Sequence, residues 1–194
     1  MLDTELILAC IKNDKAAQKQ LFEAYYGKMA VVANRFSKSN EQGKQVIKEG
    51  FAHIFNNLTK FKNQNALSLD EWMKQEFILF TVGFIRSIRN EYYVASTVRA
   101  TDTAPKSMDL FVDNMITDFK NVDLDVLILS LQQLVPSQRL VYNLNIVDGY
   151  DLQKVSEILE ASEQTVKSNF EKSKYNLQKN IDKNNKSLKN EQFV

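Results

Sequence analysis

Apolar residues recur every three or four positions along most of the chain, which is the spacing of a helix with one buried face. In the first half this spacing predicts four helices, over 4–11, 16–36, 46–58 and 69–93. Asp3 or Thr4 can cap the first helix through its side-chain oxygen. The polar break at 37–43 predicts a tight hairpin between the second and third helices, and the polar segment 59–68 predicts a connecting loop.

The periodicity is lost between residues 94 and 121, where Ser, Thr, Asp and Pro105 surround one apolar island, as is typical of a linker with a short helical piece. Apolar spacing returns at Leu124, is interrupted at Pro136 and ends in a turn at Asp148–Gly149. We therefore expect an all-α protein of two small helical domains joined by a linker. The expected boundaries are 1–94 and 123–182 for the domains, 95–122 for the linker and 183–194 for a frayed polar tail.

The composition favours a helical protein and, together with the absence of targeting patterns, a cytoplasmic location. Five glycines and two prolines are few for 194 residues, because an all-β protein needs more turn residues to reverse its strands. The net charge of +1 does not by itself indicate a partner, since the charges can be sorted onto separate faces. Cys10 is the only cysteine, and its apolar neighbours predict that it is buried. The chain shows no signal-peptide pattern and no apolar run of about 18 residues, so we expect a cytoplasmic protein without a membrane span.

The strongest functional pattern is a helix-turn-helix between Asp151 and Leu177. There LQKVSEIL and EQTVKSNFEKSKYNLQ have the apolar spacing of two short helices, and the turn-like EAS joins them. Ser162 can cap the second helix. Lysines neutralise phosphates, while Gln, Thr and Ser can bond to base edges in a major groove. The predicted DNA contacts are Gln164, Thr165, Lys167, Ser168 and Lys172, with Lys154 touching phosphate from the first helix. The alternative interpretation is an ordinary helical hairpin with a solvated lysine face.

The end of the fourth predicted helix is a second candidate for nucleic-acid contact. Its apolar half ends near Ile88, within the basic and aromatic sequence RSIRNEYY. Aromatic faces stack on unpaired bases and arginines hold phosphates, so this end suits a single strand. The predicted contacts are Arg86, Arg89, Asn90, Tyr92 and Tyr93. The alternative is a helix end whose cations interact favourably with the helix dipole.

The segment LQQLVPSQRLVYNLNIVDGYDLQKVSEILEASEQTVKSNFEKSKYNL resembles the C-terminal, minus-35-reading region of sigma-70 family factors of the extracytoplasmic-function (ECF) type. The resemblance spans roughly residues 127–177, with an acidic-Gly turn, a Val-x-x-Ile-Leu scaffold and TVKS at the recognition helix. The segments LILACIKNDKAAQKQLFEAYYGKM and VIKEGFAHIFNNLTKF are similar to the family's minus-10 and core-polymerase-binding region. The resemblance implies an initiation factor whose partners are promoter DNA, core RNA polymerase and an anti-sigma factor.

The chain departs from the family pattern in two informative places. The family's second N-terminal block usually carries acidic residues that bind the clamp helices of the polymerase β′ subunit. Gln45, Lys48 and Glu49 stand there instead, which removes charge-assisted pairs with a basic partner. The predicted polymerase contacts are Gln45, Lys48, Glu49 and Phe51. Glu160 stands where the family commonly has a glycine in the turn, so it has either to avoid the left-handed backbone region or to accept strain.

The sequence does not predict an enzyme, a cofactor or a metal site. His53 is the only histidine, so neither a histidine-based catalytic triad nor a multi-histidine metal site can be built, and no nucleotide-binding glycine pattern is present. Two alternatives to an initiation factor stay open. One is a helix-turn-helix regulator that has lost productive polymerase binding. The other is an interaction protein whose sigma-like helices titrate an anti-sigma partner or another helical protein without binding promoters.

Overall fold

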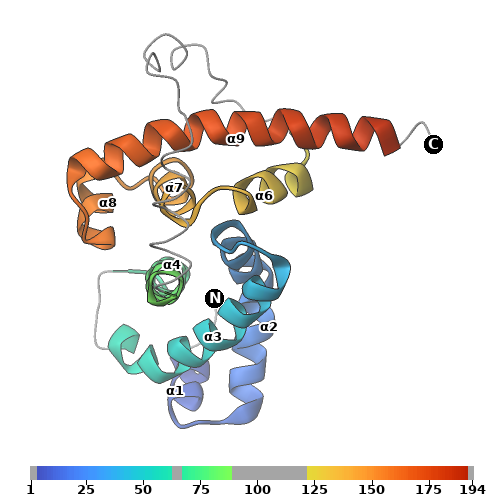
Figure 1. Cartoon of the computed structure of the whole chain (residues 1–194). Helices are drawn as coiled ribbons and strands as arrows, with labels where there is room; N and C mark the ends of the chain where they lie inside the picture. The colour runs from blue at the N-terminus through green and yellow to red at the C-terminus, as the bar shows by residue number, and fades with distance from the viewer. Residues whose placement is uncertain (1–3, 63–66, 89–121, 192–194) are drawn as a thin grey trace. The chain divides into compact units, whose positions relative to one another are not determined.

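The computed structural model describes residues 4–62, 67–88 and 122–191 (Figure 1). These residues form helices and short connections, with no strand among them, which confirms the all-α fold. The chain divides into two compact units, Met1–Phe84 and Ile85–Val194. The finer division into domains 1–94 and 123–182 stays a prediction, and most of the linker expected at 95–122 lies outside the described residues.

The described residues of the first unit form α1 (Thr4–Ile11), α2 (Lys15–Phe36), α3 (Asn40–Lys62) and all but the last three residues of α4 (Leu69–Ser87). α2 and α3 pack as the predicted hairpin. Asp14 caps α2, since its carboxylate accepts hydrogen bonds from the backbone N–H groups of Ala16 and Ala17 at 2.8 and 3.1 Å. Cys10 is buried, as its apolar neighbours predict.

α3 continues beyond the apolar stripe that predicts it, so the loop expected at 59–68 is wrong in its first part. The helix runs to Lys62. Phe61 supplies a physical reason, because the centroid of its ring lies 5.5 Å from that of Trp72 in α4. A segment that is polar on average therefore holds one aromatic contact, and this contact anchors the last turn of α3.

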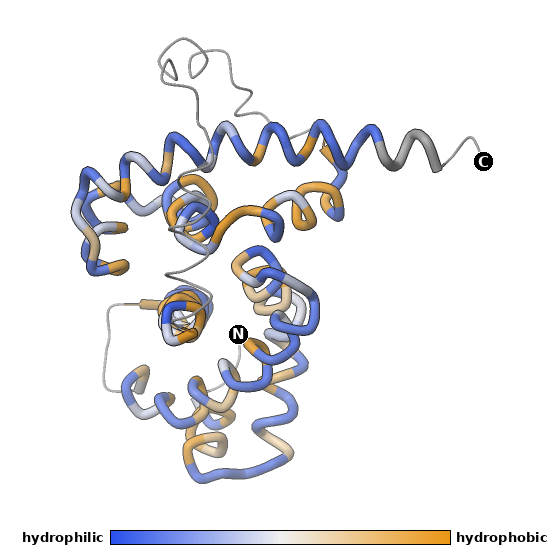
Figure 2. Tube along the Cα trace, in the orientation of Figure 1, coloured by the Kyte–Doolittle hydropathy of each residue, from blue (hydrophilic) through white to orange (hydrophobic). Residues whose placement is uncertain are grey.

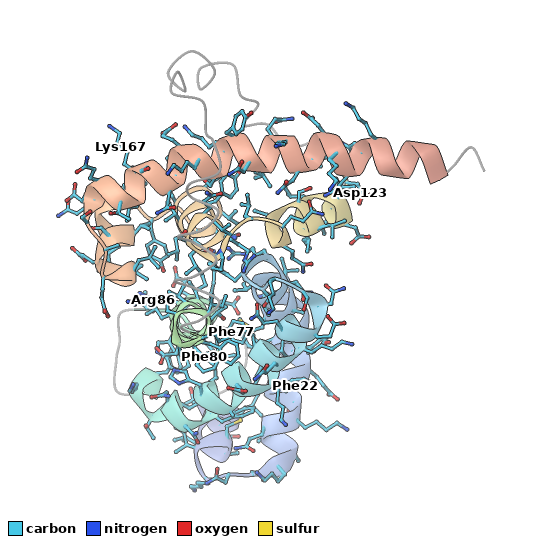
Figure 3. All side chains as sticks on the ribbon, viewed as in Figure 1. Phe22, Phe77, Phe80, Arg86, Asp123 and Lys167 are labelled. Carbon is cyan, nitrogen blue, oxygen red and sulfur yellow. The ribbon has the colours of Figure 1, made fainter. Side chains whose placement is uncertain are left out.

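Phe51 lies within an aromatic cluster of the first unit, and Figure 3 labels two of its neighbours, Phe22 and Phe77. The ring of Phe51 in α3 lies 4.6 Å from that of Phe22 in α2 and 6.1 Å from that of Phe77 in α4. Gly50 lets α3 approach this cluster closely, because a Cβ at position 50 would lie 2.5 Å from the Phe77 ring. Phe77 is itself fully buried, so a side chain at this position would disturb the core.

The second unit contains α6 (Leu124–Gln132), α7 (Pro136–Tyr142), a π-helical turn (Asn143–Val147), α8 (Leu152–Leu159) and α9 (Glu163–Glu191). α9 contacts α6, α7 and α8, and it therefore organises the unit. Figure 2 shows apolar residues concentrated in α6 and a largely hydrophilic α9. Gly149 closes the predicted turn before α8 with a φ of 77°, a left-handed conformation that glycine adopts without strain.

α9 extends past the point at which the sequence predicts its end. Residues 183–191, expected as a frayed tail, continue the helix. Ile181 joins the core cluster together with Leu177. Asn184 is 7% exposed, and its amide donates a hydrogen bond to Ser130 Oγ at 2.9 Å. A buried asparagine is as polar as an exposed one, so the apolar pattern of the sequence does not reveal that this part of the helix is packed.

A buried arginine fastens α7 to the end of α6. Arg139 is 2% exposed, and its Nη1 donates hydrogen bonds to the backbone carbonyls of Gln132 and Leu134 at 2.9 and 2.8 Å. These carbonyls lie at or just beyond the C-terminal end of α6, where unpaired acceptors and the helix dipole favour a cation. The buried charge is thus stabilised by the main chain of the preceding helix.

Candidate nucleic-acid interface

α8 and α9 are two helices joined by a tight turn, at the position that the sequence predicts. Asp151 caps α8, because its carboxylate accepts the backbone N–H of Lys154 at 2.7 Å. Val155 and Leu159 are buried on one face of α8, and Val166 is buried in the first turn of α9. These apolar side chains hold the two helices together and leave their other faces to solvent.

The turn between the helices is closed by main-chain hydrogen bonds around Glu160. This residue adopts the left-handed conformation, with φ 50° and ψ 45°. The N–H of Ala161 donates to the Ser156 carbonyl at 3.0 Å, and the N–H of Glu160 donates to the Glu157 carbonyl at 3.2 Å. Of the two outcomes that the sequence leaves open, Glu160 accepts the strain. The tight turn is kept without a glycine, at a cost of about 1 to 2 kcal/mol.

α9 begins with a capping arrangement that uses two hydroxyl groups. The Ser162 hydroxyl accepts the backbone N–H of Thr165 at 3.2 Å, and the two side-chain oxygens lie 2.8 Å apart. Ser162 therefore caps the helix as the sequence predicts. The Thr165 hydroxyl is held in place by the cap, so its position at the start of α9 is defined before any ligand binds.

The DNA contacts predicted on the second helix lie on its solvent side. Gln164, Thr165, Lys167 and Ser168 are exposed, and Lys172 is half-buried. Figure 3 shows Lys167 projecting outward from the N-terminal part of α9. We call these five side chains the reading face of α9. The structure brings them onto one surface at the capped end of a long helix.

Two asparagines that the sequence pattern did not single out hold α9 against α7. The Ser137 hydroxyl donates to Asn169 Oδ1 at 3.2 Å, and Asn176 Nδ2 donates to Gln138 Oε1 at 2.9 Å. Ser137 and Gln138 are buried, so these bonds fix the rotation of α9 about its own axis. The seven-residue spacing of the asparagines, about two helical turns, is the one sequence signal that reveals them.

Two lysines near the reading face are engaged within their own helices. Lys154 Nζ lies 2.8 Å from Glu157 Oε2, and this hydrogen bond raises the pKa of Lys154. Lys174 Nζ lies 2.9 Å from Glu171 Oε2 and 4.6 Å from the centroid of the Phe170 ring. Lys154 is exposed and can exchange its carboxylate for a phosphate, whereas Lys174 packs along a ring and is left out of the candidate site.

Three of the four predicted polymerase contacts lie on the exposed side of α3. Gln45, Lys48 and Glu49 are exposed, and Gln45 Nε2 donates a hydrogen bond to Glu49 Oε1 at 3.0 Å. The surface role predicted for Phe51 has to be corrected, because its side chain is 3% exposed and lies in the aromatic cluster. Its side chain stabilises the fold and is not available to a partner.

Of the predicted single-strand contacts, only Arg86 lies within the described residues. Arg86 lies in the last turn of α4. The remaining four, Arg89, Asn90, Tyr92 and Tyr93, lie outside the described residues. Their contact with nucleic acid stays a prediction.

The histidine has a packing role, and the described ranges offer no metal site. His53 Nε2 lies 2.8 Å from Glu76 Oε1, and the His53 ring lies 5.0 Å from that of Phe80, which links α3 to α4. Within 4–62, 67–88 and 122–191, no group of three His, Cys, Asp or Glu side chains could hold a metal ion. None of the described helices combines the length and the hydropathy that a membrane crossing requires.

Comparisons with known proteins match nearly the whole chain. The family model described as ECF sigma factor matches residues 3–183. No curated protein sequence matches the chain significantly. Among solved structures, the chain is similar to the sigma factor RpoE from Bartonella quintana, co-crystallised with the anti-sigma factor NepR, with a TM-score of 0.51 and 16% identity. The alignment covers 84% of this chain and 96% of RpoE, and at this identity the likeness is one of fold.

Proposed function

The chain belongs to the extracytoplasmic-function (ECF) sigma factor family, and from this premise we propose which of its surfaces carry the function. Members of this family bind core RNA polymerase and direct it to promoter DNA, so the chain is a sigma-type transcription initiation factor. The family is one of transcription factors, and we assign no catalytic step to the chain itself.

The second unit supplies the minus-35 surface in this proposal. The observation that carries it is the reading face, held at the capped start of α9 by the turn at Glu160 and the two asparagine bonds to α7. The first six residues of α9 span about 9 Å and fit a major groove about 12 Å wide. We assign Gln164, Thr165 and Ser168 to base edges and Lys167 to phosphate. Lys172 and Lys154 are assigned to the flanking backbone.

The first unit is assigned to core polymerase and to the minus-10 DNA. Gln45, Lys48 and Glu49 give α3 an exposed surface of mixed charge. Because opposite charges on neighbouring turns largely cancel, this surface would bind through hydrogen bonds and shape rather than through net charge. The predicted single-strand contacts, beginning at Arg86, are assigned to the melted minus-10 strand.

A regulatory partner completes the proposal. The similar RpoE was crystallised with an anti-sigma factor, and we assign this chain a partner of the same class. Because core RNA polymerase works in the cytoplasm, we place the chain there.

Mixing the full chain with core RNA polymerase tests the proposal. We expect co-elution in gel filtration and new transcription start sites on genomic fragments. Sequence-selective DNA binding without polymerase association would instead identify a helix-turn-helix regulator, the alternative that the mixed-charge block at 45–49 favours. Association with a helical protein partner in the absence of both activities would identify an interaction protein.

Lys167→Ala and Gln164→Ala should separate phosphate contact from base reading. Lys167→Ala is expected to weaken binding about equally across sequences and to reduce the salt slope by about 1, because one phosphate contact is lost. Gln164→Ala should change the preferred sequence, by about 1 to 3 kcal/mol at one base pair. Fluorescence-anisotropy titrations over a range of salt measure both effects. Lys60→Ala, at an exposed lysine of α3, is the control, and a Lys167→Ala slope equal to that of the control would contradict the assignment.

A further inference from the structure

A stripe of lysines follows the reading face along the outer side of α9. The stripe consists of Lys172, Lys179, Lys183 and Lys186. Their spacings of seven, four and three residues place them on one side of a helix. Lys179, Lys183 and Lys186 are exposed. Lys172 also belongs to the reading face, so the lysine stripe begins within the reading face and continues on the same side of α9.

Basic charge is concentrated in this half of the helix. Residues 172–186 contain five lysines and one aspartate, a net charge of +4, which leaves a net charge of −3 for the remainder of the chain. The charges of this nearly neutral protein are therefore unevenly distributed along the sequence. A shallow surface hollow is lined by Tyr175, Gln178, Lys179, Asp182, Lys183 and Lys186, so the last three lysines of the stripe lie close together. The carboxylate of Asp182 accepts a hydrogen bond from Gln178 Nε2 at 2.9 Å.

The inner side of the same segment is anchored by buried contacts. Ile181 packs in the core cluster, and Asn180 Nδ2 donates to the Ser130 carbonyl at 3.1 Å. Asn184 bonds to Ser130 Oγ and accepts a hydrogen bond from Gln133 Nε2 at 3.3 Å. A polar helix of this length gains most of its stability from tertiary contacts rather than from propensity. These contacts keep a lysine-rich segment helical and turn its lysines outward.

Distance along α9 separates the lysine stripe from the groove that the first turns of the helix would enter. At about 1.5 Å per residue, Lys172 lies about 14 Å and Lys186 about 35 Å from the first residue of the helix. A major groove is about 12 Å wide, so the lysine stripe lies beyond it, where DNA offers phosphates rather than base edges.

We propose that the lysine stripe binds the phosphate backbone of duplex DNA that flanks the element read by the first turns of α9. The inference rests on the proposed function for the placement of those first turns. Its own chemistry is independent of sequence, because phosphates are the same at every base pair. An acidic protein surface also attracts lysines, but the continuity of the stripe with the reading face on one helix favours DNA.

The variant that tests the proposal is the full chain with Lys179→Gln, Lys183→Gln and Lys186→Gln. Glutamine keeps the helix propensity of lysine and removes its charge. Binding to a duplex of about three helical turns and arbitrary sequence is titrated over a range of salt. The slope of log affinity against log salt should be shallower than in the wild type by about 2 to 3, since up to three phosphate contacts are lost.

The matched control is the full chain with Lys12→Gln, Lys44→Gln and Lys60→Gln, which removes three exposed lysines from the first unit. Its slope should stay close to that of the wild type. Equal slopes for both triple variants overturn the proposal, while sequence-selective binding, and with it the proposed function, can still stand. A chain without sequence preference whose slope depends on the lysine stripe upholds the phosphate contact of the stripe and overturns the base-reading role proposed for the first turns of α9. If the stripe variant loses polymerase at an unchanged DNA slope, an acidic protein surface replaces DNA as the partner.

Discussion

Glu160 carries backbone strain that another residue would relieve. Its left-handed conformation is costly for a residue with a Cβ, so Glu160→Gly should raise the free energy of unfolding by about 0.5 to 1 kcal/mol. Part of the relieved strain is offset because glycine adds freedom to the unfolded chain. Urea unfolding measures the change. Glu160→Ala, which keeps the strain and removes the side chain, is the control, and a glycine variant no more stable than the alanine variant would count against the strain.

Two glycines in helices predict opposite effects of the same substitution. At Gly50 a Cβ would lie 2.5 Å from the buried Phe77 ring, so Gly50→Ala should destabilise the first unit by about 1 to 3 kcal/mol. At Gly27 nothing lies within 4 Å, so Gly27→Ala should stabilise α2 by about 0.5 to 1 kcal/mol through helix propensity. Thermal unfolding of both variants measures the sign and size of each change in stability. A stabilising shift in both variants would show that Phe77 yields to the new methyl group.

Single residues differ in how far their sequence context predicts them. The cap at Ser162 follows from sequence because its partner is a backbone group three residues away, whereas the sequence leaves two conformations open for Glu160 and the structure decides between them. The burial of Arg139 depends on carbonyls at the end of another helix, which no local pattern reports. Phe51 belongs to an apolar stripe, yet its position in a partner-binding block suggested a surface role, and only packing separates the two interpretations.

At the scale of helices, a hydrogen-bonded carboxylate links α2 to α4. Asp70, in the first turn of α4, accepts a hydrogen bond from the Tyr25 hydroxyl and lies 3.2 Å from Lys28 Nζ. The bond from Tyr25, followed by that from Lys28, holds the pKa of Asp70 below its ordinary value. Ionised Asp70 therefore stabilises the first unit above the pKa of an unfolded aspartate, about 3.9, and this stabilisation is lost as pH falls through the folded-state pKa.

Asp70→Asn should accordingly lower the free energy of unfolding at neutral pH and matter less in acid. The difference from the wild type should shrink on acidification from about pH 7 to about pH 3, because the wild-type carboxylate becomes protonated. Urea unfolding at several pH values measures it. Tyr25→Phe removes the first hydrogen bond to the carboxylate and should reproduce part of the effect. A difference that stays constant with pH would mean that the ionisation of Asp70 does not contribute.

Helix positions were predicted better than helix ends. The apolar stripes place α2, α3 and α8 correctly because one face of each is buried, and burial is what periodicity detects. α9 is longer than predicted because Asn180 and Asn184 donate hydrogen bonds to α6. Apolar periodicity does not detect contacts between polar groups. For the same reason the sequence predicts the reading face but not the asparagines that hold it.

For the whole molecule, each unit has buried residues of its own. The first unit has the aromatic cluster around Phe51, and the second has the cluster that contains Leu177 and Ile181. We expect the fragments 1–88 and 122–194 to fold separately, each with a cooperative thermal transition in circular dichroism. A fragment that becomes helical only when its counterpart is added would refute this independence.

The division into two helical units could be expected from the sequence, since a long aperiodic segment separates two periodic ones. The family resemblance added the function that periodicity alone could not supply. What neither predicted is the length of α9, because it depends on how α6 packs against a helix that is distant in sequence.

The length of α9 also makes it a lever. Val166, beside α8, and Asn184, beside α6, are buried eighteen residues apart on one rod, a separation of about 27 Å. A tilt of about 5° imposed at the α6 end would carry the other end through about 2 Å, more than a hydrogen bond to a base edge tolerates. If Gln164 contacts a base edge as proposed, a protein bound to α6 would control that contact through the tilt of α9.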